Sequence, residues 1–452
     1  MSTKPSIPKG TRDFLPDELV KRDHVFNTIA SVYGRFGFQK IETPTIENLN
    51  TLLGKYGDEG DKLLFRILNS GDFLSKVPQD VIDTKNSSLF SAAIAEKGLR
   101  YDLTVPFARF VVQHRNELIF PFRRYQIQPV WRADKPQKGR YREFFQCDAD
   151  IIGSDSLLNE LELIQIMDHV FSALGVPVTI RFNNRKILAG IADIIGAGKQ
   201  FTALTVIIDK MDKIGITGVI DELKISGFSD EGIETVKAIL LIEGDNAEKV
   251  DFLAGMIQNT NTGAKGIEEV KQLLKYLESF KAKNKVILDA TLARGLNYYT
   301  GAIFEVTAND VKMGSLCGGG RYDDLTGIFG WEGVSGVGIS FGADRIVDVM
   351  EQMQCFDLRN ANTTRVLFVN FGGDEEQYAL KALMQIRYAG IVAEIYPDPV
   401  KMKKQMSYAN ERKIPFVVIA GSKERENSVF TLKDMVKGTQ EEISLEELIS
   451  KL

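Results

Sequence analysis

Residues 122–150 constrain the fold of this chain more than any other stretch, because two arms of alternating character flank a charged turn. Successive side chains of a strand point to opposite faces. The polar residues of the first arm therefore share one face: Arg124, Gln126, Gln128 and Arg132. The returning arm places polar residues and one aromatic ring on a single face: Arg142, Phe144, Gln146, Asp148 and Asp150. The pattern predicts an antiparallel hairpin with a polar face.

The chemistry of this predicted face suits a nucleotide. The turn carries four basic residues: Lys135, Lys138, Arg140 and Arg142. An arginine stays charged and binds two phosphate oxygens at once. The ring of Phe144 can stack on a base, while Gln146 and Asp150 can hold a polar or cationic group. A solvated hairpin with ordinary surface charge would show the same pattern, so both interpretations stay open here.

Glycine-rich segments farther along the chain favour the nucleotide. Residues 286–345 read as strands and turns, and the first turn carries Arg294, Tyr298 and Tyr299. Three consecutive glycines follow at 318–320, which allow close approach of a ligand or simply a tight turn. Arg345 then lies in the first turns of a helix, where an anion is favoured. Three separate arginines beside such elements predict a nucleotide with its phosphates held open.

The N-terminal third offers weaker signals. A helix is expected over residues 16–36 with Thr11 or Asp13 as its cap, then a strand over residues 38–44 that ends at a proline. Residues 70–88 read as a polar loop. Asp102 and Thr104 share a face where a strand changes to a helix, so they are candidate binding residues. Thr104 could equally be the cap of that helix.

The chain of 452 residues is too long for one hydrophobic core and suggests two to four domains. Residues 185–284 lose strand signals and read as amphipathic helices, which predicts a helical insertion. Residues 352–363 read as a linker, and the remainder alternates strands and helices as in a small α/β domain. Its lysines at 401, 403 and 404 could hold RNA phosphates, or simply form a solvated helix face.

Composition excludes several classes of protein. The apolar runs are too short to span a bilayer, and the N-terminus lacks the apolar core of a signal peptide. Three cysteines far apart predict neither disulfides nor a metal site. These features predict a cytoplasmic protein without membrane contact. A net charge of -5 means that any RNA contact must come from local basic patches.

Six segments together resemble the histidyl-tRNA synthetases, a family of class II aminoacyl-tRNA synthetases. IETP resembles the first class II motif, a dimer-interface strand ending in proline; RADKPQKGRYREFFQCDAD resembles the second, and SGVGISFGADRI the third. LARGLNYYTG and CGGGRYDDL resemble two signature peptides specific to the histidine enzyme, and LRYDLT the segment that holds the substrate amino group. The resemblance covers nearly the whole chain.

The resemblance implies roles for individual residues. The implied ATP-binding residues are Arg132, Asp134, Arg140, Phe144 and Arg345. The implied histidine-binding residues are Asp102, Leu103, Thr104, Arg132, Gln146, Asp150, Arg294, Tyr298 and Tyr299. Arg132 would contact the α-phosphate and the histidine carboxylate, and Arg294 would stabilise the charge that develops on the α-phosphate. Asp134 stands where the second motif usually has a glutamate, and Asn297 departs from the aspartate of the usual signature peptide.

The resemblance also implies an architecture and an activity. Residues 1–184 and 285–355 would form an α+β catalytic core with an antiparallel sheet, residues 185–284 the helical insertion, and residues 362–452 an α/β anticodon-binding domain. The chain would join L-histidine to tRNA(His) through histidyl-adenylate at the expense of ATP. Mg²⁺ is expected with ATP, although its ligands cannot be named from the sequence, and no prosthetic group is expected. A homodimer is implied by the family alone.

Two other classes of protein must be weighed against this assignment. A regulatory paralogue without catalysis, or a class II synthetase for threonine or proline, would share parts of the pattern. The two histidine-specific peptides argue against both. The polar segment 70–88 is longer than the family pattern requires, and the three histidines, at 24, 114 and 169, match none of the motif positions.

Overall fold

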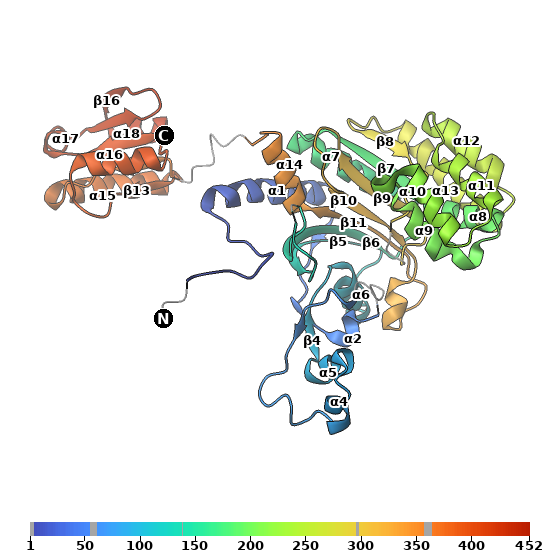
Figure 1. The fold of residues 1–452 in the computed structure, drawn as a ribbon. Coiled ribbons are helices and arrows are strands. Elements are labelled where there is room, and N and C mark those ends of the chain that lie inside the picture. Colours follow the sequence, from blue (N-terminus) through green and yellow to red (C-terminus); the bar gives the residue numbers. More distant parts are fainter. Residues whose placement is uncertain (1–3, 55–60, 138, 295–297, 357–363) are drawn as a thin grey trace. The chain divides into compact units, whose positions relative to one another are not determined.

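The computed structural model describes residues 4–54, 61–137, 139–294, 298–356 and 364–452. The chain forms two compact units, Met1–Cys355 and Phe356–Leu452. No sheet of the described residues is shared between the two units (Figure 1). Within the described residues, every helix is too short or too polar to cross a bilayer.

An eight-stranded sheet organises the first unit. Its strands, in spatial order, are β1 (Gln39–Lys40), β5 (Phe122–Trp131), β6 (Glu143–Ile152), β11 (Gly336–Gly342), β10 (Cys317–Tyr322), β9 (Ala302–Ala308), β7 (Val178–Asn184) and β8 (Lys285–Leu288). The outermost pair at each edge is parallel, and all the others are antiparallel. The predicted hairpin is confirmed as β5 and β6, with Arg124 opposite Asp150 and Gln126 opposite Asp148.

Helices cover the two faces of this sheet differently. On the apolar face lie α1 (Pro16–Arg35), α7 (Leu158–Leu174) and α14 (Ala343–Gln352) (Figure 1). Tyr33 of α1 donates a hydrogen bond to the carbonyl of Cys147 in β6, at 2.7 Å. On the polar face, α6 (Thr104–Gln113) places Phe107 4.0 Å beneath the guanidinium of Arg124.

Two N-terminal predictions are wrong in detail. Neither Thr11 nor Asp13 caps α1: the N-cap is Leu15, and the hydroxyl of Thr11 donates to Pro8 instead. The helix begins at Pro16, which has no N–H to satisfy. The strand expected over residues 38–44 is only Gln39–Lys40, because the chain then turns away and offers the carbonyl of Thr43 to Arg100.

A small three-stranded sheet follows, made of β2 (Ile46–Asn48), β4 (Lys97–Leu99) and β3 (Arg66–Ile67), with α2 (Leu49–Leu52) packed beside it. The polar loop predicted over residues 70–88 holds more structure than expected. It contains α4 (Gln79–Asp83) and the start of α5 (Ser87–Ile94). The side chain of Asn86 starts α5 by accepting the N–H groups of Ser88 and Leu89.

Residues between β7 and β8 are helical, as predicted. The helices are α8 (Arg185–Ile194), α9 (Phe201–Ile208), α10 (Met211–Ile225), α11 (Asp230–Leu240), α12 (Asn246–Ile257) and α13 (Asn261–Glu278), with a short 3-10 turn at Gly198–Gln200. Side chains of Ser229, Asp245 and Thr260 cap the last three helices. A Cβ at Gly190 would meet the backbone of Gly263, so glycine permits the close packing of α8 on α13.

The second unit is the small α/β fold expected from its alternating pattern. Its five strands, in spatial order, are β13 (Ala393–Ile395), β12 (Val366–Phe368), β14 (Phe416–Ile419), β15 (Phe430–Asp434) and β16 (Gln440–Ile443). The first three are parallel and the rest antiparallel. The helices are α15 (Gly373–Tyr388), α16 (Met402–Glu411), α17 (Ser422–Asn427) and α18 (Leu445–Lys451). Helices α15 and α18 share one apolar cluster with the sheet, and α16 another.

Candidate active site

The polar face of the central strands is built from large side chains on β6 and small ones on β11. Gly338 pairs with Asp150, Ser340 with Asp148, and Gly342 with Gln146. A Cβ at Gly338 would overlap a carboxylate oxygen of Asp150. Glycine in β11 therefore leaves the β6 side chains room to stand on the sheet.

Asp150 is held by two partners. Its Oδ2 lies 2.6 Å from Nη2 of Arg124, and its Oδ1 accepts a hydrogen bond of 2.7 Å from the hydroxyl of Tyr322. All three side chains are buried. Burial raises the pKa of Asp150, and the positive charge of Arg124 opposes this rise.

A small cavity opens beside this pair. Its lining combines backbone, hydroxyl and carboxylate groups: Thr104, Asp148, Asp150, Tyr298, Tyr299, Gly318, Gly319, Tyr322, Gly338, Ile339 and Ser340. The rings of Tyr298 and Tyr299 lie 4.8 Å apart. Burial raises the pKa of both tyrosines, so both stay neutral donors at pH 7. The cavity thus offers donors and acceptors to a small polar ligand.

Thr104 is not the N-cap of α6, which was the alternative to its role as a binding residue. Asp102 accepts the N–H of Val105 at 3.2 Å, and Leu103 is the N-cap residue without a side-chain bond. Thr104 therefore does not cap the helix and instead lines the cavity. Leu103 is fully buried, and the described cavity does not include it. Asp102 is also buried, and its charge acts on Tyr298 and on Asp148.

Arginines gather at the turn end of the hairpin. Nε of Arg132 donates to the carbonyl of Tyr101 at 3.1 Å, and its guanidinium lies 5.2 Å from the ring centre of Phe144. Arg140 forms an ion pair of 2.7 Å with Asp134. Arg345 of α14 donates to the carbonyls of Gly139 and Ser315, each at 2.8 Å. The hairpin turn and α14 are therefore joined through Arg345.

The charges of these arginines converge. Burial lowers the pKa of Arg345, and the positive charges of Arg132, Arg140 and Arg294 lower it further. Glu305 is the acid that partly offsets them. Guanidinium groups that repel one another attract a polyanion, and each can bind phosphate oxygens in pairs. The arrangement therefore suits a triphosphate.

Arg294 is positioned by its backbone and by neighbouring strands. Its φ of 43° is unusual for a residue other than glycine. Nη1 donates to the carbonyl of Phe304 at 2.7 Å and lies 4.0 Å from Glu305. On the other side, Arg185 of α8 donates to the carbonyl of Arg294 at 3.2 Å. Asn297, which departs from the signature peptide, falls outside the described residues.

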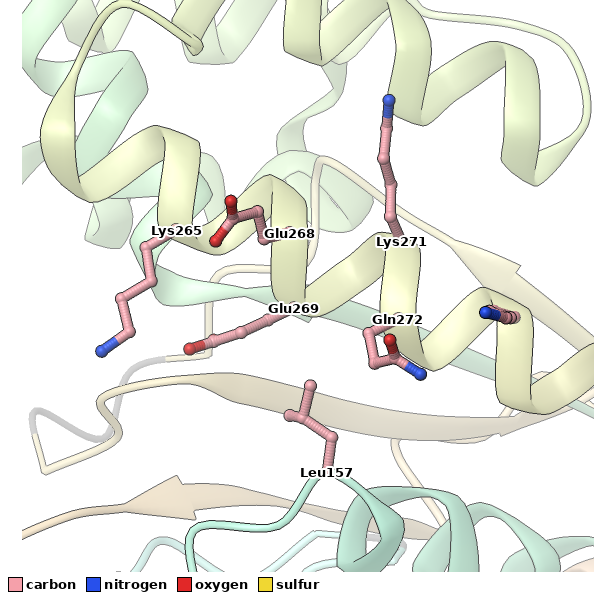
Figure 2. Close-up of a pocket in the computed structure, with 7 residues that line it drawn as sticks. Leu157, Lys265, Glu268, Glu269, Lys271 and Gln272 are labelled. Carbon is pink, nitrogen blue, oxygen red and sulfur yellow. The ribbon is translucent and has the colours of Figure 1, made fainter.

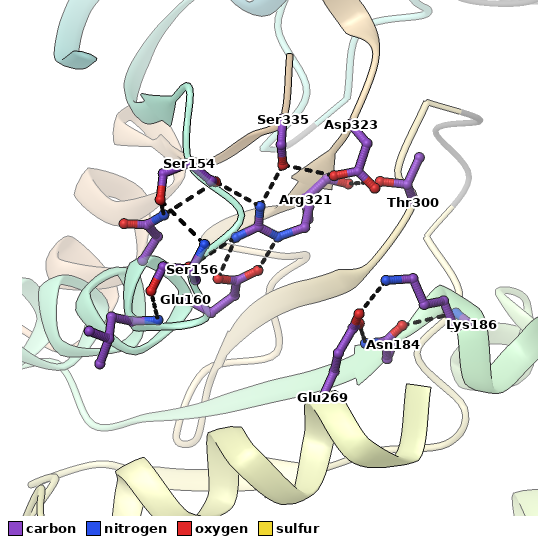
Figure 3. Close-up of polar contacts among 12 residues, drawn as sticks. Ser154, Ser156, Glu160, Asn184, Lys186, Glu269, Thr300, Arg321, Asp323 and Ser335 are labelled. Atoms are coloured by element: carbon purple, nitrogen blue, oxygen red, sulfur yellow. Dashed lines mark hydrogen bonds and ion pairs between the residues drawn. The ribbon is translucent and has the colours of Figure 1, made fainter. Parts of the chain in front are cut away.

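Two buried clusters fix the strands that carry the site. Arg321 of β10 forms an ion pair with Glu160 of α7 and donates to Ser335 Oγ at 2.6 Å (Figure 3). Asp344 of α14 pairs with Arg12 and Arg22, and its Oδ2 accepts the N–H of Phe145 at 2.9 Å. The residues next to Tyr322, Arg345 and Phe144 are thus anchored.

A larger hollow lies away from this site, on the helical region (Figure 2). It is lined by residues of α13 and by one residue just before α7: Leu157, Lys265, Glu268, Glu269, Lys271, Gln272 and Lys275. Glu269 points toward the sheet side, where it pairs with Lys186 and accepts from Asn184 at 2.7 Å (Figure 3). None of the predicted site residues lines this hollow.

Sequence reasoning omitted three polar side chains of the cavity. Asp148 stands on the predicted polar face, so alternation alone could have included it. Tyr322 lies inside the peptide CGGGRYDDL, and Ser340 inside the peptide SGVGISFGADRI. Gln146 donates to Ser340 Oγ at 2.9 Å, which places it next to the same cavity. Among the described residues, no group of three acidic, histidine or cysteine side chains could hold a metal ion.

Comparisons with known proteins agree with this geometry. A family model described as "Histidyl-tRNA synthetase" matches residues 10–75 and 95–346, and one described as "Anticodon binding domain" matches residues 365–452. The unmatched residues 76–94 hold all of α4 and α5 and overlap part of the polar segment 70–88.

Curated relatives and solved structures match over the full length. The chain is 57% identical to a histidine–tRNA ligase of Bacteroides fragilis (strain YCH46) over 452 residues, covering 100% of both. It is 56% identical to that of Porphyromonas gingivalis (strain ATCC BAA-308 / W83), covering 97% of this chain and 96% of the relative. The crystal structure of histidyl-tRNA synthetase from Nostoc sp. PCC 7120 superimposes with a TM-score of 0.83 at 29% identity, covering 100% of both chains.

Proposed function

This chain belongs to the histidyl-tRNA synthetase family, and on that premise we propose how its residues divide the work of the reaction. The chain has histidine–tRNA ligase activity: it joins L-histidine to tRNA(His) through histidyl-adenylate and releases AMP and pyrophosphate. The observation that carries the division of roles is the convergence of Arg132, Arg140, Arg294 and Arg345 next to a cavity for a small polar molecule.

In the first step, the carboxylate of histidine attacks the α-phosphorus of ATP, and pyrophosphate leaves. Arg132 holds the α-phosphate and the histidine carboxylate, while the ring of Phe144 stacks on adenine. Arg140 and Arg345 hold the β- and γ-phosphates, with Asp134 orienting Arg140 through their ion pair. Arg294 stabilises the charge that develops on the α-phosphate, since a fixed cation lowers the barrier most where charge grows.

The cavity accepts the rest of the amino acid. Asp102, Thr104 and Gln146 hold the ammonium end, and Leu103 supports them from the core. Tyr298, Tyr299 and Asp150 hold the imidazole end. An amino acid with the wrong side chain leaves these buried polar groups without hydrogen-bond partners. The site therefore discriminates against it more strongly than an apolar pocket would. This explains selection of histidine without a second site for hydrolysis.

The second step involves tRNA. The terminal ribose hydroxyl attacks the adenylate carbonyl, and AMP leaves. We propose that residues 1–184 and 285–355 act as the catalytic core, residues 185–284 as the helical insertion, and residues 362–452 as the reader of the anticodon. In the last part, Lys401, Lys403 and Lys404 stand exposed at the start of α16, where they can contact RNA phosphates.

Mg²⁺ would accompany ATP. It commonly binds through phosphate oxygens, water and one or two carboxylates. Glu305, 4.0 Å from Arg294, is a carboxylate within reach of the proposed phosphates and fits this role. We further propose that two copies form the working enzyme and that it acts in the cytoplasm, as the family resemblance implies.

Pyrophosphate exchange tests the proposal. The purified chain is incubated with ATP, labelled pyrophosphate and each amino acid in turn. Exchange with histidine alone is expected. Exchange with threonine or proline would replace the proposed specificity, and the absence of any exchange would favour a regulatory protein that only senses histidine.

A further inference from the structure

Asp148 is a carboxylate of the cavity to which none of the roles above assigns a function. Its side chain is 2% exposed and lines the cavity between Gln146 and Asp150 on β6. The hydroxyl of Ser340 hydrogen-bonds the carboxylate. Its Oδ1 is buried, and none of the residues that the structure describes gives it a hydrogen bond.

Such an atom needs an explanation. Burying a polar oxygen without a partner costs about 1–3 kcal/mol, and more when it is charged. In its neighbour Asp150, Oδ1 accepts the hydroxyl of Tyr322, and Oδ2 forms an ion pair of 2.6 Å with Arg124 that lacks hydrogen-bond geometry. Asp148 is therefore the cavity carboxylate whose Oδ1 has neither a hydrogen bond nor an ion pair among the described residues.

We propose that Asp148 binds the amino-acid substrate: its Oδ1 accepts a hydrogen bond from an N–H group of histidine, either the α-ammonium or the imidazole. This inference rests on the proposed function and adds a second buried carboxylate to the histidine site. The position between Gln146 and Asp150 lies between the two ends assigned to the ligand. A cationic or N–H donor is the chemistry that satisfies a buried carboxylate.

The electrostatic surroundings support the same role. Burial raises the pKa of Asp148 to about 7, with Arg124 opposing the rise and Asp150 and Asp102 adding to it. Other titratable groups also interact electrostatically with Asp148: Tyr33, Arg100, Cys147, Tyr299 and Cys317. In the free protein Asp148 is thus part-protonated near neutral pH. A donor from histidine lowers its pKa, so histidine binding releases a proton.

The test is the Asp148→Asn variant, which keeps the shape of the side chain and removes its charge. We expect KM for histidine in pyrophosphate exchange to rise about ten-fold or more while KM for ATP stays unchanged. The dependence of histidine KM on pH between 6 and 8 should weaken in the variant. Free histidine titrates in the same range, but its contribution is common to both proteins and cancels in the comparison.

A histidine analogue whose ring is thiazole distinguishes the two donors, because it keeps the ammonium and lacks a ring N–H. If the penalty of Asp148→Asn persists with this analogue, the ammonium is the donor; if the penalty vanishes, the imidazole is. The matched control is Asp168→Asn, which removes another buried carboxylate; among the described residues it accepts hydrogen bonds from Lys283 N–H and from the N–H and side chain of Asn284. The control should lose stability without changing KM for histidine.

An unchanged histidine KM in a folded Asp148→Asn protein overturns the inference. If that variant does not fold, a crystal of the unaltered protein with histidine decides: a distance above about 3.5 Å from Oδ1 to every histidine nitrogen overturns it. Both results leave histidine-dependent exchange by the unaltered protein intact, so failure of this inference and failure of the proposed function are distinguishable.

Discussion

Gly318 lies directly against the side chain of Arg294: a Cβ at Gly318 would overlap Nη1 of that arginine. The glycine run therefore serves the guanidinium as well as the strand. Gly318→Ala should push Arg294 from its place and lower the rate of pyrophosphate exchange by about 100-fold, the scale of losing one preorganised charge donor. Gly255→Ala, on a helix where a Cβ meets nothing within 4 Å, is the control and should leave the rate unchanged.

Arg294→Ala should abolish adenylate formation while the protein stays folded. The side chain donates to the carbonyl of Phe304 and lies 4.0 Å from Glu305, so its loss removes charge from the transition state rather than packing from the core. Exchange kinetics and far-ultraviolet circular dichroism measure the two effects. Exchange at the unaltered rate would remove Arg294 from the catalytic role.

Deletion of residues 362–452 should spare adenylation and weaken tRNA charging. The two compact units have separate sheets and separate apolar clusters, so the first should fold without the second. Exchange and charging are measured on the same preparation. Equal charging by the shortened chain would show that this part does not contribute to tRNA binding.

Glu160→Gln should destabilise the protein by about 3–5 kcal/mol, because it leaves the buried guanidinium of Arg321 without its anion. Both side chains are almost fully buried, and two hydrogen bonds join them. Urea unfolding measures the loss. The double variant Glu160→Gln with Arg321→Met should recover part of it, since no unpaired charge remains; a single-variant loss below about 1 kcal/mol would contradict the prediction.

The stability of the protein should depend on pH through Asp148. Its pKa of about 7 in the folded state exceeds the ordinary value of 3.8. The folded state therefore keeps a proton that the unfolded state loses, and the free energy of unfolding falls as pH rises from about 4 to about 7. Unfolding in urea across this range should show a shallower slope for Asp148→Asn, by on the order of 1 kcal/mol per pH unit. Identical slopes would contradict the raised pKa.

Much of the fold follows from local pattern. Alternation along residues 122–150 predicts the hairpin and the polar face that Arg124 and Asp150 share, whereas the register that pairs these two residues comes from the structure. The cap of α1 could not be predicted, since Pro16 starts that helix without a side-chain acceptor. The short helix α4 was not predicted, because its five residues, QDVID, are too few to show an apolar period.

The candidate site is harder to predict, because its chemistry lies in contacts between distant segments. The pattern places Asp148 and Asp150 on one face but cannot show that Arg124 and Tyr322 engage only the second. Likewise, the spacing of Arg132, Arg294 and Arg345 does not reveal that their charges meet. Resemblance to a family supplied that expectation, and the fold supplies the distances.

The bond from Arg185 to the carbonyl of Arg294 has a consequence for protein engineering. An exchange of helical segments between related enzymes would naturally be cut at the end of β7, which assigns Arg185 to the donor sequence. A graft that keeps the recipient's arginine at this position preserves the hydrogen bond to the carbonyl of Arg294, the proposed catalytic residue. The exchange of helical segments at the end of β7 therefore depends on one guanidinium group, that of Arg185, at the junction of the two sequences.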